Sequence, residues 1–168
     1  MKSEDILMNI IIEQTQEEDI PALTKAMTHA FDHDAQVHLG VEKGGPEGYD
    51  DGGFFRKWLF SYDESDGYKI LLDDEVIGGI IVWVFEHHKN RVGVIFVDPD
   101  YQDHGIGATA WRFIEQAYLE TESWTLGTPS WAVKNHYFYE RKCGFTKIGE
   151  EEPPDRSGVS FIYQKVMK

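Results

Sequence analysis

The sequence has no long hydrophobic run and a single cysteine. Its longest nearly apolar stretch, Val76–Phe85, is about half of the ~20 residues that a membrane-crossing helix needs. Glu4 and Asp5 stand where a secretory signal would carry basic and then apolar residues. Cys143 has no second cysteine with which to form an intrachain disulfide. We therefore expect a cytoplasmic protein with no membrane partner.

Positive charge is also scarce. The chain has 16 Lys and Arg residues against 30 Asp and Glu residues, and its formal net charge is -14. Such a chain repels the phosphates of nucleic acids and anionic membranes, so we expect neither as a partner and favour a cationic one. Solubility alone is the other explanation of the charge. At 168 residues, with no repeat or linker, we expect a single domain over 1–168.

Strands and helices are expected to alternate along the chain. An apolar stripe at Ile20, Leu23, Met27 and Ala30 predicts an early helix that begins at Thr15. Further helices are expected at 54–60, 105–119 and 132–142, and a long glycine-rich loop at 38–53. Strands are expected at 8–14, in a hairpin that turns at 73–74, and at 91–97, 123–129, 145–151 and 159–166.

A glycine-rich stretch follows one of these strands. Gly105, Gly107 and Ala110 satisfy the G-x-G-x-x-G/A pattern of dinucleotide binding. A dinucleotide fold, however, places the first glycine directly after its first strand and a carboxylate ~20 residues later. Here four expected strands precede the glycines, six residues separate Val97 from His104, and the next strand, "SWTLGT", ends without a carboxylate. No GK[ST] follows either, so we exclude both nucleotide-binding loops.

The same stretch still suits an anion. Pro99 ends the strand, and the helix that follows begins with N–H groups that have no partners. Gly105 and Gly107 leave room for an anion, and the helix dipole adds favourable charge, with further N–H groups from Ala108 or Thr109. An ordinary glycine-rich helix start is the alternative.

Two motifs resemble those of the GNAT N-acetyltransferase superfamily. The pyrophosphate motif, strand–D-P–x-x-Q/R-x-x-G-x-G/A–helix, is matched by Val97, Asp98, Pro99, Gln102, Gly105 and Gly107. The second is the helix "NHYFYERKCGF", Asn135–Phe145, and the order of elements is similar from Met8 to Val166. The resemblance implies an α/β (α+β) fold with a mixed, mostly antiparallel central sheet of six to seven strands, splayed central strands and about four flanking helices. It also implies acetyl-CoA as co-substrate.

The resemblance assigns roles to individual residues. The pyrophosphate would be cradled by backbone groups of Gln102, Asp103, His104, Gly105, Ile106, Gly107, Ala108 and Thr109. Backbone groups of Phe96 and Val97 would pair with the pantetheine arm, and Asn135 would contact that arm. Tyr139 would be the general acid that protonates the departing thiolate; core packing is its alternative role.

The spacing around Tyr139 departs from the family. The family's tyrosine stands four residues before the glycine, whereas Tyr139 stands five before Gly144. A helix bulge or a longer turn must absorb the extra residue. If it were absorbed before the tyrosine, Tyr139 would turn about 100° away, and Tyr137 and Glu140 would compete for the role.

Amine acetylation also needs a base, because deprotonating an alkyl ammonium at pH 7 costs roughly 4–5 kcal/mol. Glu86 is one candidate, with Asp32 and Asp34 as others, although an exposed carboxylate without a role is the alternative for each. We expect no metal, because the histidines lack a rigid ligand spacing and read as solvent-facing: His29, His33, His38, His87 and His88. Cys143 is expected to be a packing residue.

The segment 31–55 supplies acids, aromatics and glycines for an acceptor pocket. We therefore expect an N-acetyltransferase that acts on an amine of a small molecule or peptide, most readily a cationic one. A catalytically weak acetyl-CoA-binding sensor of the same fold is the alternative function. A homodimer is included among the expected partners.

Overall fold

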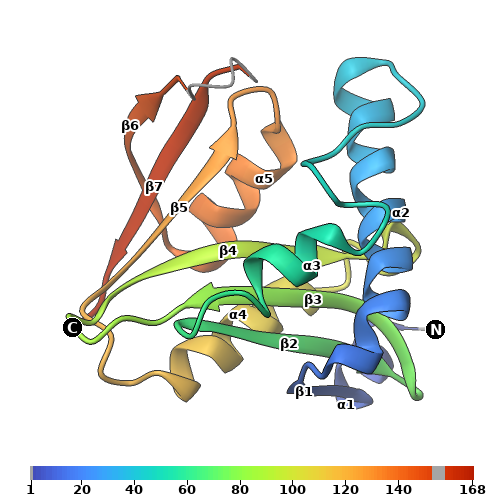
Figure 1. The fold of residues 1–168 in the computed structure, drawn as a ribbon, viewed down its shortest axis with the longest axis horizontal. Coiled ribbons are helices and arrows are strands. Elements are labelled where there is room, and N and C mark those ends of the chain that lie inside the picture. The colour runs from blue at the N-terminus through green and yellow to red at the C-terminus, as the bar shows by residue number, and fades with distance from the viewer. Residues whose placement is uncertain (1, 153–157) are drawn as a thin grey trace.

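Seven strands form one sheet in the order β1-β2-β3-β4-β5-β7-β6 (Figure 1). The structure, a computed structural model, describes residues 2–152 and 158–168. The strands are β1 (Ile10–Gln14), β2 (Ser65–Leu72), β3 (Glu75–Trp83), β4 (Lys89–Val97), β5 (Ser123–Pro129), β6 (Thr146–Glu151) and β7 (Ser160–Val166). Among the strand pairs of these described residues, only β4–β5 is parallel. The expected mixed, mostly antiparallel sheet is therefore confirmed.

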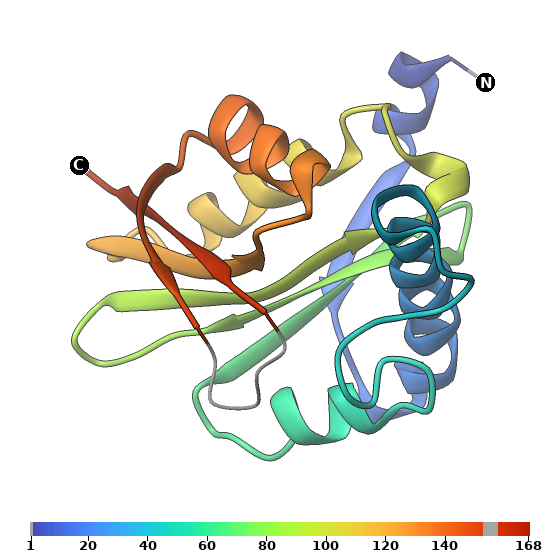
Figure 2. The same ribbon diagram turned by 90° about the horizontal axis from the view of Figure 1, so that it is seen from above.

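Helices cover both faces of the sheet (Figure 2). They are α1 (Ser3–Met8), α2 (Ile20–Leu39), α3 (Gly53–Trp58), α4 (Ile106–Ala117) and α5 (Val133–Tyr137). One core lies under α2 and α3, and a second lies under α4 and the segment that follows α5. The predicted stripe on α2 is confirmed, since Ile20, Leu23, Met27 and Ala30 are all buried. Among the described residues, every helix is too short or too polar to cross a bilayer.

The bounds of α2 differ from the prediction at both ends. The helix begins at Ile20 and not at Thr15, because a 3₁₀ turn, Glu17–Asp19, comes first. It then continues to Leu39, so the glycine-rich loop that was expected from His38 starts later. Helix α1 was not predicted.

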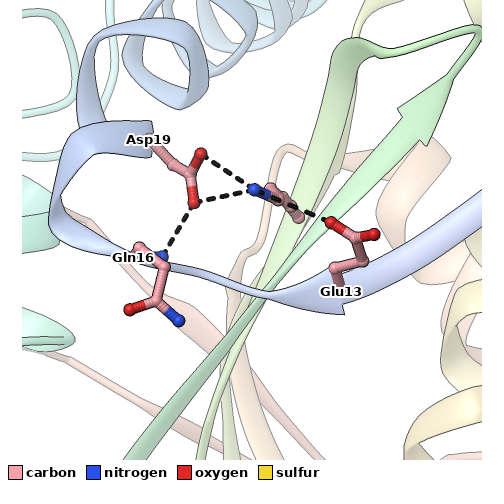
Figure 3. A network of polar contacts seen from close by, with 4 residues as sticks. Glu13, Gln16 and Asp19 are labelled. Atoms are coloured by element: carbon pink, nitrogen blue, oxygen red, sulfur yellow. Dashed lines mark hydrogen bonds and ion pairs between the residues drawn. The ribbon is translucent and has the colours of Figure 1, made fainter.

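Lys69 on β2 ties the start of α2 to the sheet. Figure 3 shows how Asp19, Gln16 and Glu13 lie in this network of polar contacts. The Lys69 ammonium lies 2.9 Å from the carboxylate of Asp19 and 3.8 Å from that of Glu13 on β1. The same Asp19 carboxylate accepts the backbone N–H of Gln16 at 2.8 Å. The direction in which α2 leaves the sheet is therefore fixed by charge as well as by apolar packing.

Strands β4 and β5 part after a short contact. Their only register pairs join 89–91 of β4 to 123–125 of β5. Beyond these pairs, Val92 and Val94 face consecutive residues of β3, which leaves Gly93 as the extra residue of a bulge. A bulge bends and twists the strand that carries it, and this one comes directly after the last β4–β5 pair. The expected splay of the central strands is confirmed (Figure 1).

The predicted helix 132–142 is in fact two segments. Helix α5 passes directly into a π-helix, Phe138–Cys143, which ends at Gly144 with a φ of 83°. The Gly144 N–H donates to the Tyr139 carbonyl, one residue further back than in an α-helix. The extra residue before Gly144 is thus absorbed by a helix bulge, which was one of the two expected alternatives. Cys143 is a packing residue, as expected; burial raises the pKa of its thiol to about 12.

Candidate active site

A cavity of about 1430 Å³ occupies the opening between β4 and β5 and reaches the second half of α2. Its walls come from both strands, the start of α4, α5 with the π-helix, and the loop after α2. Most of the predicted site residues line it: Phe96, Val97, Gln102, Asp103, Gly105, Ile106, Gly107, Ala108, Thr109, Asn135 and Tyr139. His104 and Glu86 do not belong to this wall.

The start of α4 presents free donors to this cavity. Gly105 caps the helix with a φ of 80°, and the Thr109 N–H donates to the Gly105 carbonyl at 3.0 Å. The three N–H groups between them, of Ile106, Gly107 and Ala108, have no acceptor within the helix. These groups and the helix dipole together make a site for an anion.

The glycines of this motif have a second cause. A Cβ on Gly107 would lie 2.9 Å from the ring of Phe138, so a glycine is needed there for the π-helix to pack on α4. Gly105 is left-handed, as is Asp103 before it with a φ of 66°, and this turn aims the chain into the helix. The sequence had assigned both glycines to the approach of an anion; at Gly107 packing also requires one.

The direction of the β4 backbone corrects the prediction for Phe96. The Asp98 N–H donates to the Ile77 carbonyl on β3 at 2.7 Å. Backbone groups alternate along a strand, so those of Phe96 also point to β3, while those of Ile95 and Val97 point into the opening. The two residues able to pair with an extended ligand are therefore Ile95 and Val97.

Gln102 connects this strand to α5. Its Nε2 donates to the Val97 carbonyl at 2.9 Å, and its Oε1 accepts from Lys134 Nζ at 3.3 Å. Of the two backbone groups of Val97, the N–H therefore stays available to a ligand in the opening. His104 turns away, since its Nδ1 shares a 2.7 Å hydrogen bond with the Ser3 hydroxyl of α1. The prediction for His104 concerned its backbone and stays a prediction; its side chain is held away from the cavity wall.

Four basic side chains of this acidic protein line the cavity, and the sequence reasoning missed them: Arg112, Lys134, Arg141 and Lys142. They come from α4, α5 and the π-helix, so only the tertiary structure brings them together. Basic side chains and free helix N–H groups are the donors that phosphate oxygens accept.

Tyr139 lies in the cavity wall and is only 7% exposed. Its ring packs edge-on against Phe138 and Phe145, with centroids 5.2 and 5.8 Å away. Burial raises the pKa of its hydroxyl above the usual range. The phenol therefore keeps its proton at neutral pH, as a general acid requires, and its catalytic role stays a prediction.

The neighbours of Tyr139 have other surroundings. Asn135 donates to the Thr128 hydroxyl on β5 at 3.2 Å and so stands at the strand opening. Tyr137 is 59% exposed, under the ammonium of Lys142. The carboxylate of Glu140 accepts a hydrogen bond from the Tyr163 hydroxyl at 2.8 Å. Of the two competitors, Glu140 is thus engaged elsewhere, whereas Tyr137 also lines the cavity, with most of its ring in solvent.

The three candidate bases lie in different places. Glu86 is exposed in the turn between β3 and β4, at the opposite end of β4 from the start of α4, so its position contradicts a role as base. Asp32 accepts the Tyr49 hydroxyl at 2.7 Å and the Gly44 N–H at 3.2 Å, and its bond raises the pKa of Tyr49 to about 12. Asp34 lines the cavity, where burial raises the pKa of its carboxyl.

One histidine, His38, is not the solvent-facing residue that the sequence indicated, whereas His29 is exposed as expected. His38 lines the cavity, and its ring lies 5.9 Å from that of Trp131. His29 Nδ1 lies 3.0 Å from the carboxylate of Asp98, just before the start of α4. Asp100 adds a carboxylate oxygen within 4.8 Å, on the protein surface. The Asp98 carboxylate also accepts a hydrogen bond from the Asp100 N–H at 2.9 Å. Asp98 therefore has partners in both His29 and Asp100.

The described residues fit coenzyme A. Parted strands with free backbone groups suit an extended pantetheine arm, and the adjoining helix start with its basic neighbours suits the phosphates. This arrangement defines an acyltransferase that uses a coenzyme A thioester. The sequence matches the acetyltransferase (GNAT) family over residues 27–145, and the chain belongs to that family.

Individual relatives agree. YrkN, an uncharacterized protein of Bacillus subtilis (strain 168), is 31% identical over 137 residues, which cover 81% of this chain and 72% of YrkN. The crystal structure of an acetyltransferase from Thermus thermophilus superposes with a TM-score of 0.76 at 13% identity, covering 95% of this chain and 97% of that one. The PaiA N-acetyltransferase of Thermoplasma acidophilum, solved with coenzyme A, gives 0.70 at 17% identity, with 94% and 99% covered. The resemblance, the fold and acetyl-CoA as co-substrate are confirmed.

Proposed function

We propose that this chain is an N-acetyltransferase that acetylates an amine of a small molecule or peptide. The observation that carries the proposal is that one cavity is lined by both a desolvated carboxylate, Asp34, and a buried phenol, Tyr139. These are the base and the acid that acetyl transfer to an amine requires.

Acetyl-CoA, when bound, supplies the acetyl group as a thioester. The N–H groups at the start of α4 and the lysine and arginine side chains around them hold its phosphates. Ile95 and Val97 hold the pantetheine arm as a neighbouring strand would. The carbonyl of Val97 already accepts a hydrogen bond from Gln102. The N–H of Val97 is suited to donate to the thioester oxygen as negative charge develops there.

Asp34 takes the proton from the acceptor's ammonium group, and the freed nitrogen lone pair forms the bond to the acetyl carbon. An alkyl ammonium has a pKa of ~10.4, so a base with a raised pKa faces a smaller mismatch than an ordinary carboxylate. His38 lies one helical turn further along α2, and its ring lies 5.9 Å from that of Trp131.

Tyr139 completes the reaction at the sulfur. As the carbon–sulfur bond breaks, its electron pair stays on sulfur, and the phenol gives that sulfur its proton. Because its pKa is raised, the buried hydroxyl keeps its proton at neutral pH and so has one to donate to the sulfur.

The test is turnover of acetyl-CoA with a panel of amines, read as free thiol release and as acetylated product by mass spectrometry. Thiol release that depends on an amine, and that falls in Asp34→Asn and Tyr139→Phe, supports the proposal. Calorimetric binding of acetyl-CoA without amine-dependent release would identify the sensor instead.

Three further expectations remain predictions from the sequence: a single domain over 1–168, a cytoplasmic location and a homodimer. Sedimentation of the purified chain tests the last of these directly. A cationic acceptor bound partly by charge should show a KM that rises with salt.

A further inference from the structure

The second half of α2 turns one face towards the cavity. Phe31, Asp34, Ala35 and His38 follow the i, i+3, i+4, i+7 spacing of a single helix face, and all four line the cavity. The first half of α2 packs on the sheet, whereas this half extends past it and stands across from α5 (Figure 1). The face therefore forms the acceptor end of the cavity.

This end of the cavity contains one negative charge. Among the described residues that line the whole cavity, the carboxylates are Asp34 and Asp103, and Asp103 belongs to the start of α4. The acids of the loop after α2, which suggested a cationic acceptor, are exposed and lie outside the wall: Glu42, Glu47, Asp50 and Asp51. Asp34 is thus the carboxylate available to an acceptor.

Apart from His38, whose ring lies 5.9 Å from that of Trp131, the rest of this end is apolar and partly aromatic. Phe31 stands edge-on to Tyr49, with centroids 6.1 Å apart, and Trp131 lies opposite on the loop after β5. The small side chains of Ala30 and Ala35 also belong to this part of the wall. Flat aromatic walls around an open space fit a ring or a branched apolar group.

We propose that the acceptor is a primary amine with a single positive charge carried on an apolar, ring-sized body. Asp34 receives the ammonium group, and Phe31 and Trp131 cover the body. A diamine would have to place its second ammonium against an apolar wall that holds no second carboxylate, which is costly. This inference rests on the proposed function, because it describes the acceptor of the same site.

The test compares kcat/KM for three amines with wild-type protein and acetyl-CoA: 2-phenylethylamine, 1,4-diaminobutane and ethanolamine. Burial of one aromatic ring should favour 2-phenylethylamine by about 10- to 100-fold over the other two. A preference for 1,4-diaminobutane, or equal values for all three, would overturn the inference.

Variants show whether the named walls cause the preference. Trp131→Ala, in a loop, should bring the ratio of kcat/KM for 2-phenylethylamine to that for ethanolamine down towards one. A smaller fraction of folded protein would lower both kcat/KM values alike and leave their ratio unchanged. Asp34→Asn should lower kcat/KM for every amine while calorimetric affinity for acetyl-CoA is kept. The charge-matched control is Asp63→Asn, at an exposed residue outside the cavity, and it should change neither value.

The inference and the proposed function fail in different ways. Thiol release with ethanolamine or 1,4-diaminobutane but not with 2-phenylethylamine would overturn only the inference about the acceptor. No release with any amine, although acetyl-CoA binds, would overturn the proposed function and this inference with it. An unchanged ratio in Trp131→Ala would show that the aromatic wall does not select the acceptor.

Discussion

Lys165 Nζ on β7 donates to the carbonyl oxygen of Cys143 at 2.8 Å, at the last residue of the π-helix. The same ammonium pairs with Glu115 on α4, and that carboxylate accepts the Trp111 indole N–H at 2.8 Å. One lysine therefore satisfies a carbonyl that a helix end leaves without a partner and joins three elements. Because the π-helix carries Tyr139, this lysine helps to fix the position of the phenol.

Lys165→Met should lower the free energy of unfolding by about 1–3 kcal/mol, because it leaves a charged acceptor and a helix-end carbonyl without their donor. Urea denaturation measures the change. The control is Lys25→Met at an exposed position of α2, where we expect a change within about 0.5 kcal/mol. Equal effects of the two variants would mean that the lysine does not brace the π-helix.

Tyr139→Phe keeps the buried ring and removes only the hydroxyl. Since loss of a general acid lowers rates by ~10²–10⁴-fold, kcat should fall by that order while the affinity for acetyl-CoA changes little. Steady-state kinetics and calorimetry measure the two quantities. Tyr137→Phe is the matched control, at an exposed ring two residues away, and should keep near-normal kcat. A reversal of the two results would assign the role to Tyr137.

Ala108→Glu tests the anion site at the start of α4. An acid in the first turn favours a helix, so the fold should be kept, yet its charge would repel the phosphates of acetyl-CoA. We expect the calorimetric Kd to rise at least about tenfold relative to Ala108→Gln, the uncharged variant of the same size. Gly107 is a poorer position for this test, because any side chain there would displace Phe138. Equal affinities of the two Ala108 variants would argue against binding at this helix.

The pH dependence of kcat/KM tests Asp34 as the base. The base must be ionised, so activity should fall as pH falls through its pKa, and burial moves that limb above the range of an ordinary carboxyl. His33 and His38 on α2 and Lys134 on α5 oppose the shift without cancelling it. Asp34→Asn should lose this limb and His38→Gln should keep it. Loss of the limb in His38→Gln alone would make the histidine the base.

Asp34→Asn should change stability and activity in opposite directions. A carboxyl whose pKa is raised on folding stabilises the protein below its unfolded-state pKa, and that contribution is lost as pH rises through the folded-state pKa. At pH 7 the ionised Asp34 therefore opposes folding. Thermal melts at pH 7 should show Asp34→Asn to be at least as stable as the wild type, and a clear drop in Tm would indicate an unrecognised structural role.

The sequence predicted well those features that depend on neighbours along the chain. The apolar stripe of α2 and the turn at Asp73 and Asp74, whose φ angles are 49° and 67°, follow from local spacing and turn chemistry. So does the start of α4 after Gly105. The end of α2 was missed for a physical reason. The helix face that lines the cavity carries Asp34 and His38, and a face with such polar residues looks solvent-exposed in the sequence.

Other site features depend on which partner lies on each side. The alternation of backbone groups along β4 can be read from the sequence, but whether Phe96 or Val97 faces the opening depends on the register with β3. The sequence alone does not show how far the turn after β3 lies from the cavity. Glu86 could therefore be excluded as the base only from the structure. The basic residues around the α4 start come from separate segments, and no local pattern marks them.

The short β4–β5 contact divides the sheet into a four-stranded part and a three-stranded part, which are joined by three register pairs. An extended ligand arm lying along Ile95 and Val97 would occupy the place of a missing strand and add a second connection between the two parts. Without it, those two amides have no backbone acceptor across the opening and should exchange with solvent deuterium early. The co-substrate thereby becomes part of the protein's own architecture, and the melting temperature should climb with its concentration.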